Sequence, residues 1–125
     1  MNRLALFLVV IVSISCSISN VEISSITVQD LKKNLINDNS LLIIDVRTKG
    51  EYDGPLGHIA NSELKPLSNI SQTIMDLQSI ADQPVYVVCR SGNRSSTATL
   101  KLRAEGINAI NVEGGMKAWN KLTNE

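Results

Sequence analysis

VYVVCRSGNRSS, residues 85–96, is the stretch on which the predicted fold and chemistry depend. Residues 85–88 are all apolar, as in a β-strand that is buried on both faces. Residues 95–105, which follow the polar stretch, have the pattern of a helix that ends before Gly106. The stretch therefore predicts a strand, a tight loop that starts at Cys89, and a helix whose N-terminus points back towards that cysteine.

The rest of the chain repeats the alternation of strand and helix. A second apolar run, LLIID, ends at Asp45, and Thr27 with Asp30 resembles the capping box of an earlier helix. The pattern predicts further strands at 59–64 and 107–112, helices at 70–80 and 116–122, and a helical turn at 48–52. This order predicts an α/β fold with a parallel sheet that has helices on both faces. Sites in such sheets lie at the carboxyl ends of the strands, where Asp45 and Cys89 stand.

Composition limits the classes of function. The chain has 125 residues, 43% of them hydrophobic, which is enough for one modest domain. Its formal net charge is zero and only 3% of its residues are aromatic, so nothing predicts a nucleic-acid partner. Its sequence has neither a metal-binding nor a phosphate-loop motif, and we expect no dissociable cofactor.

Residues 1–19 have the pattern of a signal peptide. MNR gives a short positive start, residues 4–14 are apolar apart from Ser13, and small residues follow. The apolar run is shorter than the roughly 20 residues of a membrane span. VSISC also resembles a bacterial lipobox, so cleavage before a lipid-anchored Cys16 and ordinary cleavage both stay open. We expect a mature domain, 20–125, that is exported: periplasmic, or lipid-anchored at the outer side of the inner membrane or in the outer membrane.

Cys89 would then be the only thiol of the mature protein that can react. An odd thiol in an oxidising compartment has no internal disulfide partner, so it is either buried and inert or kept for chemistry. Successive N–H groups of the loop can form a nest around the sulfur, with Gly92 at a positive φ. The nest, the helix dipole and two arginines, Arg90 and Arg94, all favour the thiolate. Such a thiolate is suited to attack a small oxyanion.

Three blocks together resemble the rhodanese domain: DVRTKGEYDGPLGHI at 45–59, CRSGNRS at 89–95 and EGGMKAW at 113–119. The resemblance spans 23–122 and is nearest to small exported thiosulfate sulfurtransferases. It implies a parallel five-stranded sheet flanked by helices. It also implies a ping-pong reaction, in which the Cys89 thiolate takes sulfane sulfur from thiosulfate and passes it to a thiol, of a small molecule or a protein, or to cyanide. The covalent persulfide on Cys89 is the only intermediate implied.

The resemblance also assigns roles to particular residues. The active-site loop, whose amides would stabilise the persulfide, comprises Cys89, Arg90, Ser91, Gly92, Asn93 and Arg94. Arg94 would help to hold thiosulfate. We infer that the positive charge of Arg90 also attracts this anion. A supporting group is mostly structural: Asp45, Arg47, Glu51, His58 and Gly115. After GHI the sequence departs from the usual family pattern at 60–62 and at Lys65, which leaves the acceptor preference open.

Other functions use the same kind of loop. Phosphatases and arsenate reductases place an arginine six positions after the cysteine, whereas here Ser95 has that position and the arginine comes at five. A persulfide carrier with a protein donor would use the same residues and stays open, whereas the presence of both Cys89 and Arg94 argues against a binding module without chemistry. A thiol-redox enzyme is disfavoured, because the chain has no CxxC.

Overall fold

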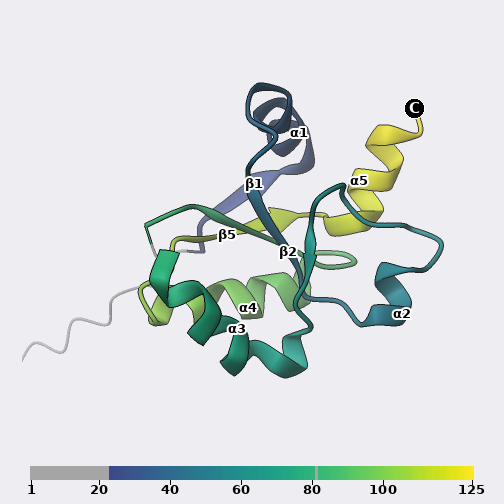
Figure 1. The fold of residues 1–125 in the computed structure, drawn as a ribbon. Helices are drawn as coiled ribbons and strands as arrows, with labels where there is room; N and C mark the ends of the chain where they lie inside the picture. Colours follow the sequence, from purple (N-terminus) through teal and green to yellow (C-terminus); the bar gives the residue numbers. More distant parts are fainter. Residues whose placement is uncertain (1–22, 81) are drawn as a thin grey trace, which may run out of the picture.

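The two fully apolar runs are adjacent central strands of one sheet (Figure 1). The computed structural model describes residues 23–80 and 82–125. In it, β2 (Leu42–Asp45) and β4 (Val85–Val88) pair in parallel, with Asp45 opposite Val88. The carboxyl ends of both strands therefore meet at one edge of the sheet, as predicted.

The sheet has five parallel strands in the order β1-β5-β4-β2-β3. This confirms the predicted α/β fold with a parallel five-stranded sheet. The outer strands are β1 (Ser25–Thr27) and β3 (Glu63–Leu64), and β5 (Ala109–Glu113) lies between β1 and β4. The helices are α1 (Val28–Asn37), α2 (Lys49–Tyr52), α3 (Ile70–Leu77), α4 (Asn93–Ala104) and α5 (Gly115–Thr123), with short 3-10 turns at η1 (Leu67–Asn69) and η2 (Gln78–Ile80).

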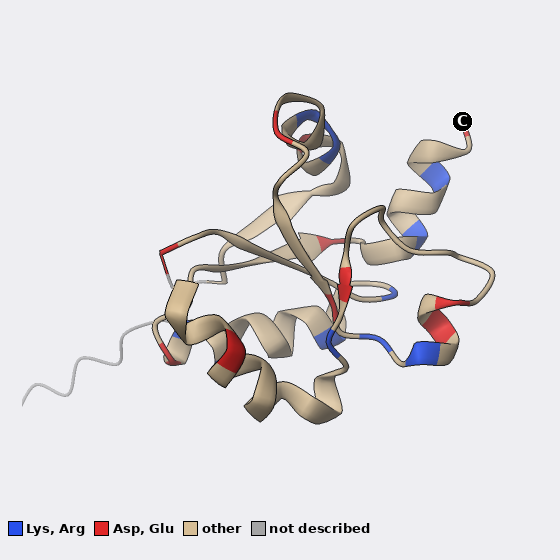
Figure 2. Cartoon of the chain, viewed as in Figure 1, with Lys and Arg blue, Asp and Glu red and all other residues tan. Residues whose placement is uncertain are grey.

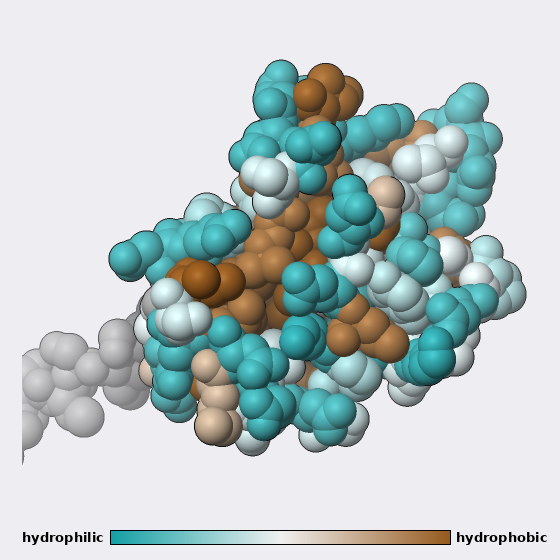
Figure 3. Space-filling model, in the orientation of Figure 1, coloured by the Kyte–Doolittle hydropathy of each residue, from teal (hydrophilic) through white to brown (hydrophobic). Residues whose placement is uncertain are grey.

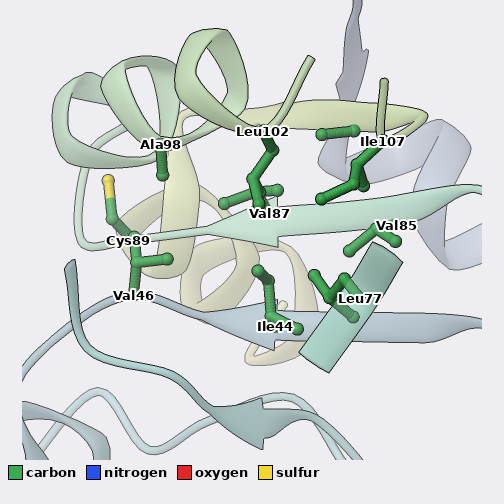
Figure 4. Close-up of a cluster of buried hydrophobic side chains, with 10 residues drawn as sticks. Ile44, Val46, Leu77, Val85, Val87, Cys89, Ala98, Leu102 and Ile107 are labelled. Carbon is green, nitrogen blue, oxygen red and sulfur yellow. The ribbon is translucent and has the colours of Figure 1, made fainter. Parts of the chain in front are cut away.

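Alternate side chains of the strands enter two separate cores. Ile44, Val87 and Ala109 face α3 and α4, and Figure 4 shows this cluster with Cys89 at its end. Ile43, Tyr86 and Val112 pack in the other cluster with residues of α1 and α5. Helices therefore cover both faces of the sheet. Cys89 lies at the end of one core, at the edge of the sheet where the carboxyl ends of β2 and β4 meet.

Several predicted elements have other limits in the structure, and hydrogen bonds explain two of these differences. The strand predicted at 59–64 is reduced to β3, because Ile59 to Ser62 form a turn in which the Ser62 N–H donates to the Ile59 carbonyl and Asn61 has a φ of 63°. The helix predicted from Ser95 begins at Asn93, because the Ser96 N–H donates to the carbonyl of Gly92, the N-cap. The cap predicted at Thr27 is present, with its side chain accepting from the Asp30 N–H.

The surface is mixed in character. Lys and Arg alternate with Asp and Glu over the chain (Figure 2), and in the view of Figure 3 a band of apolar side chains lies between hydrophilic ones. No helix among residues 23–80 and 82–125 is long and apolar enough to cross a membrane. The predicted signal peptide and the lipidation of Cys16 concern residues outside the described part of the chain, and they stay predictions.

Candidate active site

Cys89 follows the last residue of β4, and its side chain is 1% exposed. Figure 4 shows its sulfur directed towards the first turns of α4, near Ala98. The Gly92 N–H donates to Sγ at 3.1 Å, and the Ser95 hydroxyl oxygen lies 3.2 Å from Sγ. The loop therefore turns back on the thiol that starts it.

Two opposing effects set the pKa of Cys89. Burial raises the pKa, because a charge is less stable away from water, but hydrogen bonds from the Ser95 hydroxyl and from the amides of Ser95, Gly92 and Ser91 lower it more. The net result is a thiol pKa below its ordinary value. The sequence predicted the amides, but it did not identify the hydroxyl of Ser95 as the side chain that completes the nest.

Gly92 makes this loop geometry possible. Its φ is 106°, in the region that residues with a Cβ rarely adopt, and it is the N-cap of α4. The positive φ predicted for Gly92 is confirmed. Asn93, by contrast, is the first residue of α4 and has an ordinary helical backbone. The positive end of the 12-residue helix α4 therefore lies next to the sulfur.

Arg94 is bound to Glu51. Its guanidinium donates to both carboxylate oxygens, at 2.8 and 2.6 Å, and joins α4 to α2 across 43 residues of sequence. Glu51 also accepts from the N–H of Thr48 and completes a capping box of α2. The hydrogen bond from Arg94 lowers the pKa of Glu51 to about 2, although burial opposes the shift and Thr48 adds to it. Glu51 raises the pKa of Arg94 in turn.

Asp45 and Arg47 form a buried ion pair. Arg47 is 1% exposed, and its Nε and Nη2 donate to the Asp45 carboxylate at 2.7–3.1 Å. Its remaining donors bind two backbone carbonyls, those of Glu51 and Gly57. The pair ties the end of β2 to the segment after α2, which is the structural role that the sequence predicted.

His58 and Gly115 also hold the scaffold. His58 stacks on Tyr52, with ring centroids 3.7 Å apart, and its Nδ1 lies 3.0 Å from the Tyr52 carbonyl oxygen. Gly115, with a φ of 56°, packs so closely that a Cβ would stand 2.7 Å from the carbonyl carbon of Arg90. The start of α5 therefore approaches the backbone of the active-site loop closely at this glycine.

Arg90 differs from Arg47 and Arg94, the other two arginines of the site, in its exposure and pairing. It is exposed, and among the described residues its side chain has no carboxylate partner. Its backbone is fixed: the Lys117 N–H donates to the Arg90 carbonyl at 3.0 Å, and the Met116 N–H to the Cys89 carbonyl at 2.8 Å. The predicted residues thus converge on one edge of the sheet, with Cys89 buried, Arg94 paired and Arg90 open to a ligand. No cluster of side chains suited to a metal occurs in residues 23–80 or 82–125.

This arrangement agrees with the family comparison. The model of the Rhodanese-like domain matches residues 27–122. The chain belongs to the rhodanese-like family. The match runs from Thr27, the last residue of β1, to Leu122 in α5, and therefore includes every residue of the site described above.

Individual relatives give the same result. The Bacillus subtilis protein named "Putative sulfurtransferase YtwF" is 33% identical over 103 residues, which cover 82% of this chain and 95% of that protein. "Uncharacterized protein YqhL" from the same organism is 38% identical over 78 residues, covering 62% of this chain and 59% of YqhL. The chain thus spans little more than half the length of some curated relatives it matches. A solved structure titled as a rhodanese-like domain protein from Staphylococcus aureus matches with a TM-score of 0.71 and 38% identity, covering 78% of this chain and 91% of that one.

Proposed function

We propose that the protein is a sulfurtransferase that carries sulfane sulfur on Cys89, and that thiosulfate is a competent donor. One observation carries the proposal: the Cys89 sulfur lies at hydrogen-bond distance from the Gly92 amide and the Ser95 hydroxyl. These groups lower the pKa of Cys89 and favour negative charge on the sulfur, so they increase the share of the nucleophilic thiolate. The family supports sulfur transfer as the class of reaction.

In the first step the Cys89 thiolate attacks the outer sulfur of thiosulfate. The new bond joins Sγ to that sulfur, the sulfur–sulfur bond of thiosulfate breaks, and sulfite leaves with the electron pair. The product is a Cys89 persulfide with one negative charge. Loop amides stabilise this charge in the same way as the thiolate.

In the second step a thiolate or cyanide attacks the outer sulfur of the persulfide. The bond between that sulfur and Sγ breaks, and its electron pair returns to Sγ as the thiolate. The cycle requires no oxidant, no reductant and no dissociable cofactor, since the sulfur is carried covalently.

Size and charge favour a small donor such as thiosulfate. The Cys89 side chain is only 1% exposed, so a single sulfur atom approaches it more easily than a phosphate ester does. Arg90 supplies a positive charge that no carboxylate of the described residues neutralises. At the sixth position after Cys89 stands Ser95, whose hydroxyl faces the sulfur, where a phosphatase of this kind would carry an arginine.

The test is the intact mass of the purified full chain before and after incubation with thiosulfate. We expect a gain of one sulfur atom that cyanide reverses and that Cys89→Ser does not show. Cys89→Ser should keep the thermal transition of the parent, so that lost transfer reports chemistry and not unfolding. No gain from thiosulfate, with a gain from a protein persulfide donor, would identify a carrier instead. Hydrolysis of an aryl phosphate that depends on Cys89 would identify a phosphatase.

The proposal extends to location. A signal peptide at 1–19 would place the reaction outside the cytoplasm, with Cys16 either removed or lipidated. Fractionation of producing cells, with the mass of the mature N-terminus, tests this. A Cys16 that carries lipid predicts a membrane-bound product, whereas cleavage after it predicts a free one.

A further inference from the structure

A groove of about 260 Å³ lies beside the active-site loop. It is lined by Arg47, Glu51, Pro55, Leu56 and Arg90. Arg90 directly follows Cys89, and the N-terminus of α5 fixes the backbone of both residues through hydrogen bonds to their carbonyls. The groove is therefore held in a constant position next to the residue that would carry the sulfur.

Only one of the charged groups along the groove is uncompensated. Arg47 is paired with Asp45, and both oxygens of the Glu51 carboxylate are bound by Arg94. Arg90 is exposed and has no carboxylate partner within residues 23–80 and 82–125. The groove thus presents one free guanidinium, a group suited to bind a carboxylate through two parallel hydrogen bonds.

Pro55 and Leu56 form the apolar part of the groove lining. Pro55 is exposed and Leu56 is half-buried, so both have apolar surface to offer a ligand. The carbonyl of Leu56 accepts from Asn120 Nδ2 at 3.4 Å, and the carbonyl of Gly57 accepts from Arg47 Nη2 at 2.7 Å. These bonds hold this part of the lining in place before any ligand arrives, which lowers the entropy cost of binding.

We propose that this groove is the acceptor subsite, and that its ligand is a small organic thiol that carries a carboxylate. The carboxylate binds Arg90 and the carbon chain lies on Pro55 and Leu56. The volume is just below that of typical pockets for drug-sized ligands, which fits a thiol with few carbon atoms. The inference rests on the proposed function, since it names the acceptor of the same cysteine.

The transfer itself is balanced. The acceptor thiolate forms a bond to the outer sulfur of the Cys89 persulfide, and the bond from that sulfur to Sγ breaks. The electron pair stays on Sγ, which returns to the thiolate, and the acceptor leaves as an organic persulfide. The carboxylate bound to Arg90 takes no part in the chemistry and only positions the attacking sulfur.

The experiment compares acceptors on preloaded protein. The full chain is charged with thiosulfate, loading is measured by mass, and loss of the persulfide is followed after mixing with 3-mercaptopropionate or with 2-mercaptoethanol. Rates are corrected for the fraction of each thiol present as thiolate, because the thiolate is the nucleophile. We expect a preference of about 10-fold for the carboxylate thiol, the scale of one charge-assisted contact. Arg90→Gln should reduce this ratio to about 2-fold or less.

Lys117→Gln is the matched control. Lys117 is also exposed and neighbours Arg90 through the backbone, but its side chain does not line the groove. It should keep the preference of the parent. A preference for the carboxylate thiol that survives Arg90→Gln, or that Lys117→Gln removes equally, would overturn the proposed subsite. Equal rates with both thiols in the parent, or a preference of the parent for a protein thiol, would also overturn it.

Loading separates this inference from the proposed function. Protein that gains no sulfur from thiosulfate speaks against thiosulfate as the donor, and loading from inorganic polysulfide then allows the acceptor test to proceed. Protein that loads normally but shows no carboxylate preference speaks against the groove alone.

Discussion

The hydroxyl oxygen of Ser95, in the first turn of α4, lies 3.2 Å from the sulfur of Cys89 at the end of β4. The same hydroxyl lies 3.1 Å from the carbonyl oxygen of Gly92, and its single hydrogen can be donated to only one of these two acceptors, of which a charged thiolate is the stronger. Ser95 is fully buried, so water cannot replace it as a donor to the sulfur. The helix that follows the loop therefore contributes a side chain as well as its dipole to the thiolate.

Ser95→Ala should raise the pKa of Cys89. A hydrogen bond to a charged group is worth about 1.5–3 kcal/mol, which corresponds to about one to two pKa units. At neutral pH the variant should therefore form the persulfide about 10-fold more slowly and recover at higher pH. The measurement is the pH profile of thiol alkylation and of persulfide formation. Ser96→Ala, at the next position and without a contact to the sulfur, should keep the parent profile; a profile unmoved in Ser95→Ala would contradict the role of the hydroxyl.

Arg94→Ala should slow the reaction with thiosulfate through the charge that it leaves behind. Without Arg94, Glu51 keeps an uncompensated carboxylate beside the loop, and that charge repels a dianion. We expect kcat/KM for thiosulfate to fall about 10-fold, with a smaller loss of stability. Glu51→Gln in the same chain should restore part of the activity. A double variant no better than Arg94→Ala would show that the guanidinium itself binds the substrate.

The Glu51–Arg94 pair should also add to the free energy of unfolding, and this contribution should be lost at acidic pH. The pKa of Glu51 is lowered from 4.5 to about 2 in the folded protein, so the carboxylate stabilises the fold above its unfolded pKa. This contribution is complete above about pH 5.5 and is lost as the pH falls from about 4.5 to about 2. The pair is about one-third exposed, so solvent screening reduces it to about 1–2 kcal/mol.

Urea unfolding at several pH values measures this contribution. The parent should lose more stability than Glu51→Gln between about pH 6 and about pH 3, because only the parent has the carboxylate. All other acidic side chains are common to both proteins, so their effects cancel in the difference. Parallel curves for the two proteins would show that the pair adds nothing to the fold.

Gly115→Ala should displace the active-site loop. The new Cβ would stand 2.7 Å from the carbonyl carbon of Arg90, and the φ of 56° is unfavourable for alanine. We expect a loss of about 2 kcal/mol or more in the free energy of unfolding, together with slower sulfur transfer. Gly50→Ala is the control: a Cβ there meets no atom within 4 Å, and the change should be neutral or stabilising by about 0.5 kcal/mol. Normal transfer in Gly115→Ala would show that the loop tolerates the shift.

The sequence predicts those features that depend on neighbouring residues. The strand, loop and helix around Cys89 follow from twelve consecutive residues, as does the positive φ of Gly92. The pairing of Arg94 with Glu51 joins residues 43 positions apart, and no local pattern indicates it. The three-residue strand β1 is too short for a periodic signal, and it forms because Ile26 pairs with Val112 on an existing edge. Ser95 was recognisable in principle, since it follows Gly92 by three residues, the spacing at which a side chain reaches back over the first turn.

Asp45→Ala should be among the most damaging single changes in the site region. Arg47 would keep a guanidinium that is 1% exposed and has lost its carboxylate, and an unpaired buried charge costs about 3–5 kcal/mol. Replacement of both partners, as in Asp45→Leu with Arg47→Met, removes the charge as well as the bond. The double variant should therefore be more stable than Asp45→Ala in urea unfolding. If the double variant is the less stable of the two, the contacts of Arg47 with the carbonyls of Glu51 and Gly57 matter more than its pairing with Asp45.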